Sequence, residues 1–171
     1  MHQIRAGVFE TNSSSTHSIC ITTNRRTSMC HPEHVHFRCD SFGWEWRKLD
    51  TVDEKAAYLY SSAVDLMDRK ELQKATEHIV DTLFKFGITC TFEEPIYGNH
   101  GQGFLYCENA DIDHCGEGDH RAFVQRTIYN DGRLLRYLFS HDSYVLTGND
   151  NEYGSVAINA KYPHETYYKG C

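Results

Sequence analysis

The sequence predicts an α+β fold in which helices cover one side of a mostly antiparallel sheet. Strand-like alternation occurs towards both ends of the chain, and two runs of helical periodicity lie between them. Regular strand–helix alternation is missing and no G-x-G-x-x-G follows a strand, which argues against a Rossmann fold. We expect one domain, 1–171, with a helical pair at about 51–87 inserted between strand-rich segments and a loose tail at about 155–171.

The first strand is predicted from about His17 to Thr23. His17, Ile19 and Ile21 alternate with smaller or more polar residues, as in a half-buried strand. The stretch from Glu10 to the strand is polar and rich in hydroxyl groups. It has two interpretations, a turn stapled by hydroxyl hydrogen bonds or an anion cradle. In the second interpretation the phosphate-binding residues are Asn12, Ser13, Ser14 and Ser15.

Thiols and imidazoles are concentrated in residues 30–39. Zinc favours such ligands, but a structural zinc site needs four that converge. The segment lacks the C-x-x-C knuckle of a standard finger, so the alternative is a polar hairpin in which these side chains only pack. If zinc is bound here, the ligands are Cys30, His34, His36 and Cys39. Alternating aromatic residues at 42–46 then suggest a strand.

Two helices are predicted next. Thr51 and Glu54 have the spacing of a capping box, so we expect a helix from Thr51 to about Arg69. Apolar residues recur at helical spacing over 72–86, and Gly87 is well placed to end that helix. Both apolar faces are typical of a protein core, and we assign neither helix a chemical role.

Short elements follow the helical pair. Strands are predicted at 88–92 and 104–107, helices at 121–129 and around 134–139, a strand at 143–147 and a polar turn at 148–151. The loop 111–120 is dense in carboxylates and imidazoles but does not fit the EF-hand pattern. Asp113 and His114 are candidates for an acid/base pair, and the alternative is a plain polar loop.

The negative charge is uneven. The formal net charge is −7, of which residues 1–87 contribute −1 and residues 88–171 contribute −6. Such a surface repels nucleic acid and attracts a basic protein surface, although the commoner meaning of a charge run is a solvated loop. We expect a protein partner with a basic surface and no direct nucleic-acid binding. The candidate binding residues are Glu93, Glu94, Glu108, Asp111, Asp113, Glu117 and Asp119.

No apolar run of membrane-spanning length and no secretory signal pattern is present. We therefore expect a soluble protein of the bacterial cytoplasm. Seven cysteines without a regular disulfide spacing then predict mostly reduced thiols.

Three pieces of the chain carry a resemblance: GVFETNSSSTHS at 7–18, IDH at 112–114, and LFS with TGNDN at 138–140 and 147–151. Together they resemble a group of small proteins carried by phages and other mobile elements of Firmicutes and gut bacteria. Some small acidic proteins from that setting are anti-CRISPR proteins, which block a Cas nuclease. The chain departs from the expected pattern at Cys115 and Gly116, which separate His114 from the next acidic residue.

Two functions are open at this point. The resemblance and the charge suggest an anti-CRISPR inhibitor that binds a Cas9-type nuclease, with or without guide RNA, through its acidic half. The alternative is an enzyme acting on a nucleotide or another phosphate-containing small molecule, with His17, Asp113 and His114 as catalytic residues. A plainer interpretation makes His17 a hydrogen-bonded histidine at the start of a strand.

Overall fold

The computed structural model describes residues 15–21, 31–43, 47–99, 105–113 and 117–149. Helices and strands are both present, so the predicted α+β class is confirmed. The predicted single sheet is wrong, because the described strands form one three-stranded sheet and three separate two-stranded sheets. Two of the three two-stranded sheets are parallel. The predicted tail at about 155–171 lies outside the described residues.

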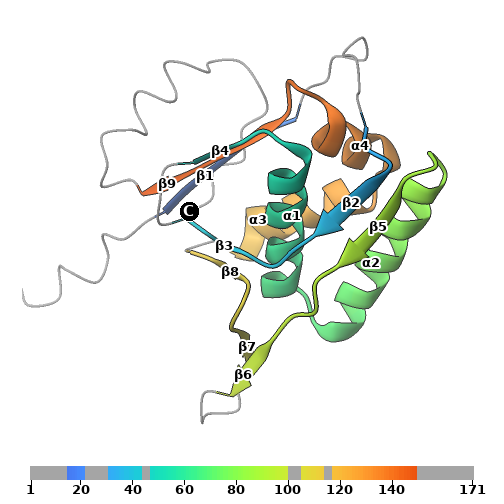
Figure 1. Cartoon of the computed structure of the whole chain (residues 1–171). Coiled ribbons are helices and arrows are strands. Elements are labelled where there is room, and N and C mark those ends of the chain that lie inside the picture. The colour runs from blue at the N-terminus through green and yellow to red at the C-terminus, as the bar shows by residue number, and fades with distance from the viewer. Residues whose placement is uncertain (1–14, 22–30, 44–46, 100–104, 114–116, 150–171) are drawn as a thin grey trace, which may run out of the picture.

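Helix α1 (Val52–Leu66) explains this arrangement. Every residue from Lys55 to Val64 is buried, and a helix buried all round needs neighbours on all sides. Helix α1 runs through the middle of the molecule (Figure 1). It contacts strands β2 (His34–Phe37) and β8 (Asp111–Ile112) and helices α3 (Glu117–Ile128) and α4 (Asp131–Phe139). One sheet covered on one side cannot surround a helix in this way, so the strands are divided among several small sheets.

The three-stranded sheet is antiparallel, with β9 (Tyr144–Asn149) between β1 (Ser15–Cys20) and β4 (Arg47–Leu49). His17, Ile19 and Ile21 are buried, which confirms the predicted alternation. Strand β9 continues to Asn149, whereas a polar turn was predicted from 148. Its pairing with Ser15 and Thr16 of β1 holds this end of β9 extended.

The parallel sheets follow from long connections. The chain between β2 (His34–Phe37) and β5 (Thr89–Phe92) contains α1 and α2 (Arg69–Phe84), and a crossover of that length allows parallel pairing. Strands β3 (Ser41–Phe42) and β8 (Asp111–Ile112) are also parallel. Strands β6 (Tyr97–Asn99) and β7 (Leu105–Cys107) pair antiparallel.

Local signals place the other helices. Helix α2 (Arg69–Phe84) begins after Asp68, whose carboxylate accepts hydrogen bonds from the Lys70 and Glu71 amides at 2.8 and 2.9 Å. The predicted stop at Gly87 is a residue with φ of +73°. Helices α3 (Glu117–Ile128) and α4 (Asp131–Phe139) follow, and α3 begins earlier than predicted.

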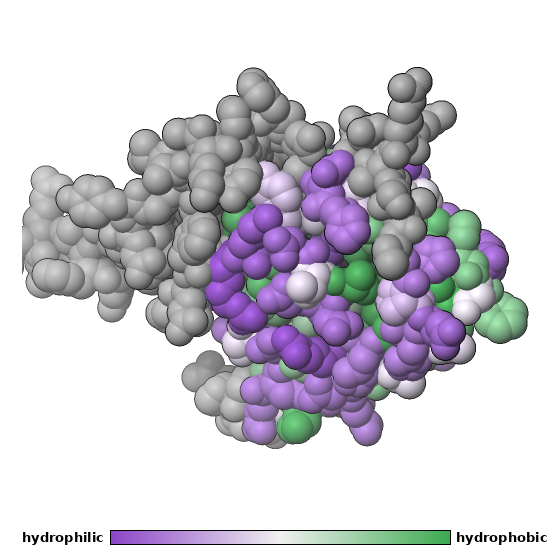
Figure 2. Space-filling view, turned by 45° about the horizontal axis from the view of Figure 1, so that its top comes forward, coloured by the Kyte–Doolittle hydropathy of each residue, from purple (hydrophilic) through white to green (hydrophobic). Residues whose placement is uncertain are grey.

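On the face shown in Figure 2, the described residues are largely hydrophilic, with separate hydrophobic residues among polar ones. Large exposed hydrophobic side chains include Phe84, Phe86 and Ile96. Within the described residues, no helix combines the length and the apolar character needed to cross a bilayer.

Candidate functional site

Described parts of the three pieces of sequence that carry the resemblance contact one another. The His17 Nε2 atom of β1 is 3.0 Å from the backbone oxygen of Asp113, which follows β8. Ser15 and Thr16 pair with Asn149 and Gly148 of β9. Residues separated by almost the whole described chain therefore meet at one place, which the sequence alone did not show.

The contact between His17 and Asp113 defines a tautomer. A carbonyl oxygen only accepts hydrogen bonds, so Nε2 of His17 carries a proton and donates it. The imidazole is fully buried, and its Nε2 partner is the peptide group of Asp113. This geometry matches the plainer interpretation, a hydrogen-bonded histidine at the start of a strand.

A second histidine lies beside the first. The His120 ring of α3 is 6.1 Å from the His17 ring and 5.8 Å from the Tyr58 ring of α1, measured between centroids. His120 is 3 % exposed, and its Nε2 has no hydrogen-bond partner among the described residues. Burial, and then the neighbouring His17, lower the pKa of His120 to about 3, so this imidazole is neutral near pH 7.

The absence of a side chain at Gly43 provides space for His17 and Asp113 to pack together. Its φ of +122° is a conformation that glycine adopts readily and other residues rarely do. A Cβ at this position would lie 2.7 Å from the Asp113 Cβ and 3.2 Å from the His17 Nε2. We call His17, Gly43, Tyr58, Asp113 and His120 the buried histidine cluster.

The other residues of the predicted catalytic and phosphate-binding sets are less completely placed. His114, Asn12, Ser13 and Ser14 lie outside the described residues. Ser15 is in β1, but the structure describes only its backbone. The structure thus brings His17 and Asp113 together, and it does not place the hydroxyl groups that would hold a phosphate.

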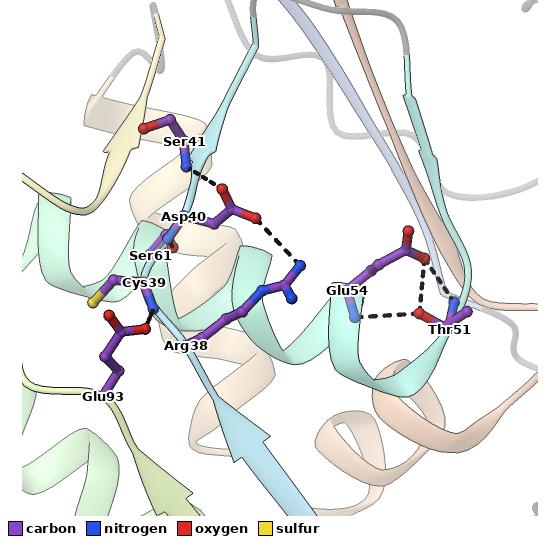
Figure 3. A network of polar contacts seen from close by, with 8 residues as sticks. All are labelled: Arg38, Cys39, Asp40, Ser41, Thr51, Glu54, Ser61 and Glu93. Carbon is purple, nitrogen blue, oxygen red and sulfur yellow. Dashed lines mark hydrogen bonds and ion pairs between the residues drawn. The ribbon is translucent and has the colours of Figure 1, made fainter.

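The predicted acidic residues divide into three groups. Glu94, Glu108 and Asp111 are exposed, whereas Glu93 and Asp113 are half-buried. The Glu93 carboxylate accepts hydrogen bonds from the Cys39 amide at 3.0 Å, drawn in Figure 3, and from the Asn109 side chain at 3.3 Å, so it ties loops together. Glu117 and Asp119 belong to α3, with only their backbones described.

The exposed carboxylates belong to adjoining segments. The Glu108 amide donates to the Ile96 oxygen at 2.7 Å, and the Asn109 side chain donates to the Glu94 oxygen at 3.2 Å. Partial burial, and then the charge of Asp111, raise the pKa of Asp65 on α1 to about 6. We call Asp65, Glu94, Glu108 and Asp111 the acidic surface.

The predicted zinc ligands are not gathered in the described part of the chain. His34 and His36 are exposed and hydrogen-bonded to the hydroxyls of Thr89 and Thr91 at 2.8 to 3.0 Å. Cys39 is buried, and burial raises the pKa of its thiol to about 12, which disfavours the thiolate that zinc needs. Cys30 lies outside the described residues, which hold no group of three or more metal-binding side chains.

A pocket of about 530 Å³ lies between α2 and the connection from β5 to β6. Three aromatic side chains line it, with charged and amide groups at its edges. This pocket could not be predicted from the sequence, because its walls come from α1, α2, β5, β6 and the β5–β6 connection, which only the tertiary fold brings together. Its lining residues are Tyr60, Arg69, Leu72, Gln73, Thr76, Phe92, Glu93, Glu94, Pro95 and Tyr97.

Sequence reasoning also missed Tyr58 and the role of His120. His120 was visible as the end of the ligand-dense loop 111–120, and its contact with His17 was the missing link. Tyr58 sits in a helical run among other apolar positions, and nothing in its spacing separates it from ordinary core residues.

Comparison with known proteins adds no assignment to this geometry. The chain matches no family model, no curated protein and no solved structure.

Proposed function

We propose that this protein is an acidic binding protein, an anti-defence inhibitor that occupies a basic surface of a Cas9-type nuclease. The observation that carries the proposal is the acidic surface: Glu94, Glu108 and Asp111 are exposed on adjoining segments. The interval from residue 93 to residue 119 contains seven carboxylates and no Lys or Arg.

The chemistry of this surface suits a protein partner. Complementary charge speeds the encounter of two proteins and helps to exclude wrong partners. The same carboxylates repel the phosphates of nucleic acid. A nuclease channel that normally holds nucleic acid offers the opposite charge, so an acidic protein can compete for it. The resemblance to mobile-element proteins supports the same class of partner.

Co-purification of the tagged protein with Cas9-type nucleases, with and without guide RNA, followed by a DNA-cleavage assay, tests the proposal. We expect a stable complex and loss of cleavage. Changing Glu94, Glu108 and Asp111 together to Lys should abolish both. We leave Asp113 unchanged, since its Cβ packs against Gly43 and its replacement would disturb the buried histidine cluster.

The matched control reverses three exposed carboxylates elsewhere, Glu33, Glu77 and Asp81, and alters the net charge equally. This control should still bind and inhibit. Equal inhibition by both triple variants would show that the acidic surface is not the binding site. Absence of a complex with every nuclease tested would overturn the proposed function.

The contacts between described parts of the three sequence pieces favour a second candidate, an enzyme acting on a nucleotide or similar phosphate compound. His17 and Asp113 would lie at its centre, with His114 and the hydroxyl groups of 12–15 beside them. Because His17 is fully buried, this function needs the cluster to open. Calorimetric titration with ATP and GTP tests it. Binding heat that is present in the unchanged protein and absent in folded His17→Gln supports the enzyme hypothesis. Absence of binding heat in the unchanged protein rejects it.

A further inference from the structure

We propose that the pocket between α2 and the β5–β6 connection is an anchor site for one arginine side chain of the protein partner. The inference rests on the proposed function and specifies the chemistry of the partner at one point. The pocket volume of about 530 Å³ lies within the usual range of ligand pockets, which is about 300–1,000 Å³.

The aromatic wall of the pocket is packed from behind. The Phe92 ring stacks on Phe37 at 4.8 Å and lies 5.3 Å from the Tyr60 ring, measured between centroids. The Tyr60 hydroxyl donates to the backbone oxygen of Glu93 at 2.8 Å. This wall is therefore fixed before any partner arrives, which lowers the entropy cost of binding.

The pocket already shows how it holds a guanidinium group. The Arg69 guanidinium carbon lies 4.9 Å from the centre of the Tyr97 ring, within the range of a cation–π contact. A second guanidinium on the aromatic wall would use the same attraction. Arginine suits it better than lysine, because its planar group both stacks on rings and pairs with a carboxylate through two hydrogen bonds.

The charges of the pocket select a cation. Its charged lining residues are Arg69, Glu93 and Glu94, so carboxylates outnumber cations there. The Glu93 carboxylate is engaged by Cys39 and Asn109, whereas the exposed Glu94 carboxylate has no hydrogen bond or ion pair among the described residues. Glu94 is the group that can pair with an incoming guanidinium.

The rim resembles a protein interface. Ile96 is 55 % exposed and adjoins Pro95 and Tyr97 of the pocket. Its backbone oxygen accepts the Glu108 amide, which joins the pocket to the acidic surface. An apolar residue beside an aromatic pocket and flanking carboxylates is a setting in which a buried arginine acts as a binding hot spot.

The test uses isotope-labelled full-length protein and three probes: N-acetyl-arginine amide, N-acetyl-lysine amide and AMP. We expect arginine amide to shift the NMR signals of Phe92, Tyr97 and Gln73 with millimolar affinity, at least threefold tighter than lysine amide. Glu94→Gln should weaken this binding at least threefold, and Gln73→Trp should abolish it by filling the pocket. The matched control is Glu33→Gln, which removes an exposed carboxylate outside both the pocket and the acidic surface and should change the affinity less than twofold.

Tighter binding of AMP than of arginine amide would overturn the proposal and indicate an anion site at Arg69. Shifts with none of the probes would also overturn it. Nuclease binding separates this proposal from the proposed function. If Gln73→Trp inhibits the nuclease as strongly as the unchanged protein, the arginine anchor site is rejected and the proposed inhibitor function stands. If the pocket binds arginine amide but the protein forms no complex with any nuclease, the preference of the pocket for arginine stands and the proposed inhibitor function is rejected.

Discussion

Lys55 shows how a single residue makes the stability of this protein depend on pH. Its ammonium group is buried in α1 and donates to the backbone oxygens of Ser140 and Ser143 at 2.9 and 3.0 Å. Burial lowers its pKa from 10.5 to about 8. Between pH 8 and pH 10.5, Lys55 is protonated in the unfolded chain and neutral in the folded protein. The free energy of unfolding therefore rises with pH over this range.

We predict that Lys55 makes the free energy of unfolding rise by up to about 3 kcal/mol between pH 8 and pH 10.5. Buried Tyr60 and Cys39, whose pKa values are raised, act in the opposite direction in the same range. Urea unfolding of the protein and of Lys55→Met separates the contributions, since only the difference between them reports on Lys55. Exposed Lys74→Met is the control, and parallel pH profiles for the protein and Lys55→Met would contradict the prediction.

His120 has the complementary effect in acid. Its folded-state pKa of about 3 lies below the ordinary 6.5, so the unfolded chain takes up the proton first as the pH falls. We predict that His120 accounts for a loss of about 3 kcal/mol of unfolding free energy between pH 6.5 and pH 4. His120→Phe should lose less stability over that range, whereas exposed His141→Gln should follow the unchanged protein. Urea unfolding at pH 6.5, 5 and 4 measures the difference.

Gly43 is predicted to be harder to replace than Gly87 or Gly132. Gly43→Ala would place a methyl group 2.7 Å from the Asp113 Cβ and would also strain the backbone at a φ of +122°. We expect a loss of about 2 kcal/mol or more of unfolding free energy. Gly87→Ala is the control for backbone strain alone, since a Cβ there meets no atom within 4 Å. Equal losses in thermal or urea unfolding would show that contact with the cluster is unimportant.

At the scale of elements, the ends of helices were the most predictable features. The capping box of α1 is formed as the spacing indicated: the Thr51 hydroxyl accepts the Glu54 amide, and the Glu54 carboxylate accepts the Thr51 amide (Figure 3). Such signals involve residues three apart and need no tertiary contact. Strand β8, of two residues, was not predicted, because only its pairing with β3 makes it a strand. The strand predicted at 42–46 overlaps β3 at Phe42 alone, and residues 44–46 lie outside the described part of the chain.

The cap of α2 is predicted to contribute measurably to stability. The Asp68 carboxylate accepts hydrogen bonds from two backbone amides. The Glu71 carboxylate, which belongs to the same capping box, also accepts hydrogen bonds from the Arg121 side chain of α3 at 2.7 and 2.8 Å. Asp68→Ala should lower the unfolding free energy, because two backbone amides at the start of α2 lose their acceptor. Asp68→Asn should retain most of the stability, because an amide oxygen accepts the same hydrogen bonds. Urea unfolding compares the two, and equal losses would show that the cap is unimportant.

At the scale of the whole molecule, sequence patterns predicted the class of the fold but not its layers. The pattern of α1 identified a helix, and only the structure shows that its polar Ser61 and Ser62 are buried along with its apolar residues. The site behaved in the same way. His17 and Asp113 were both named in advance, but a contact across 96 positions follows from packing and not from any local pattern.

The proposed interaction with a nuclease is predicted to be sensitive to salt. With a net charge of −7, the protein should associate more slowly as salt shortens the Debye length from about 10 Å at 0.1 M towards about 3 Å at 1 M. Stopped-flow or surface-binding kinetics should show an on-rate that falls at least tenfold between 0.05 and 0.5 M NaCl, with a smaller change in the off-rate. An on-rate independent of salt would contradict an electrostatic encounter.

The position of β9 also determines when the protein can be completed during synthesis. This strand, Tyr144–Asn149, lies between β1 and β4, so neither of those strands has its partner until the ribosome has made residue 149. Until then the nascent chain presents two open strand edges, which are templates for pairing with other chains. The helices α1 and α2 can begin to form long before, because the backbone hydrogen bonds of a helix are local. A chain whose translation stops before residue 144 would therefore be helical yet prone to aggregate, and it would depend on chaperones more than the finished protein does.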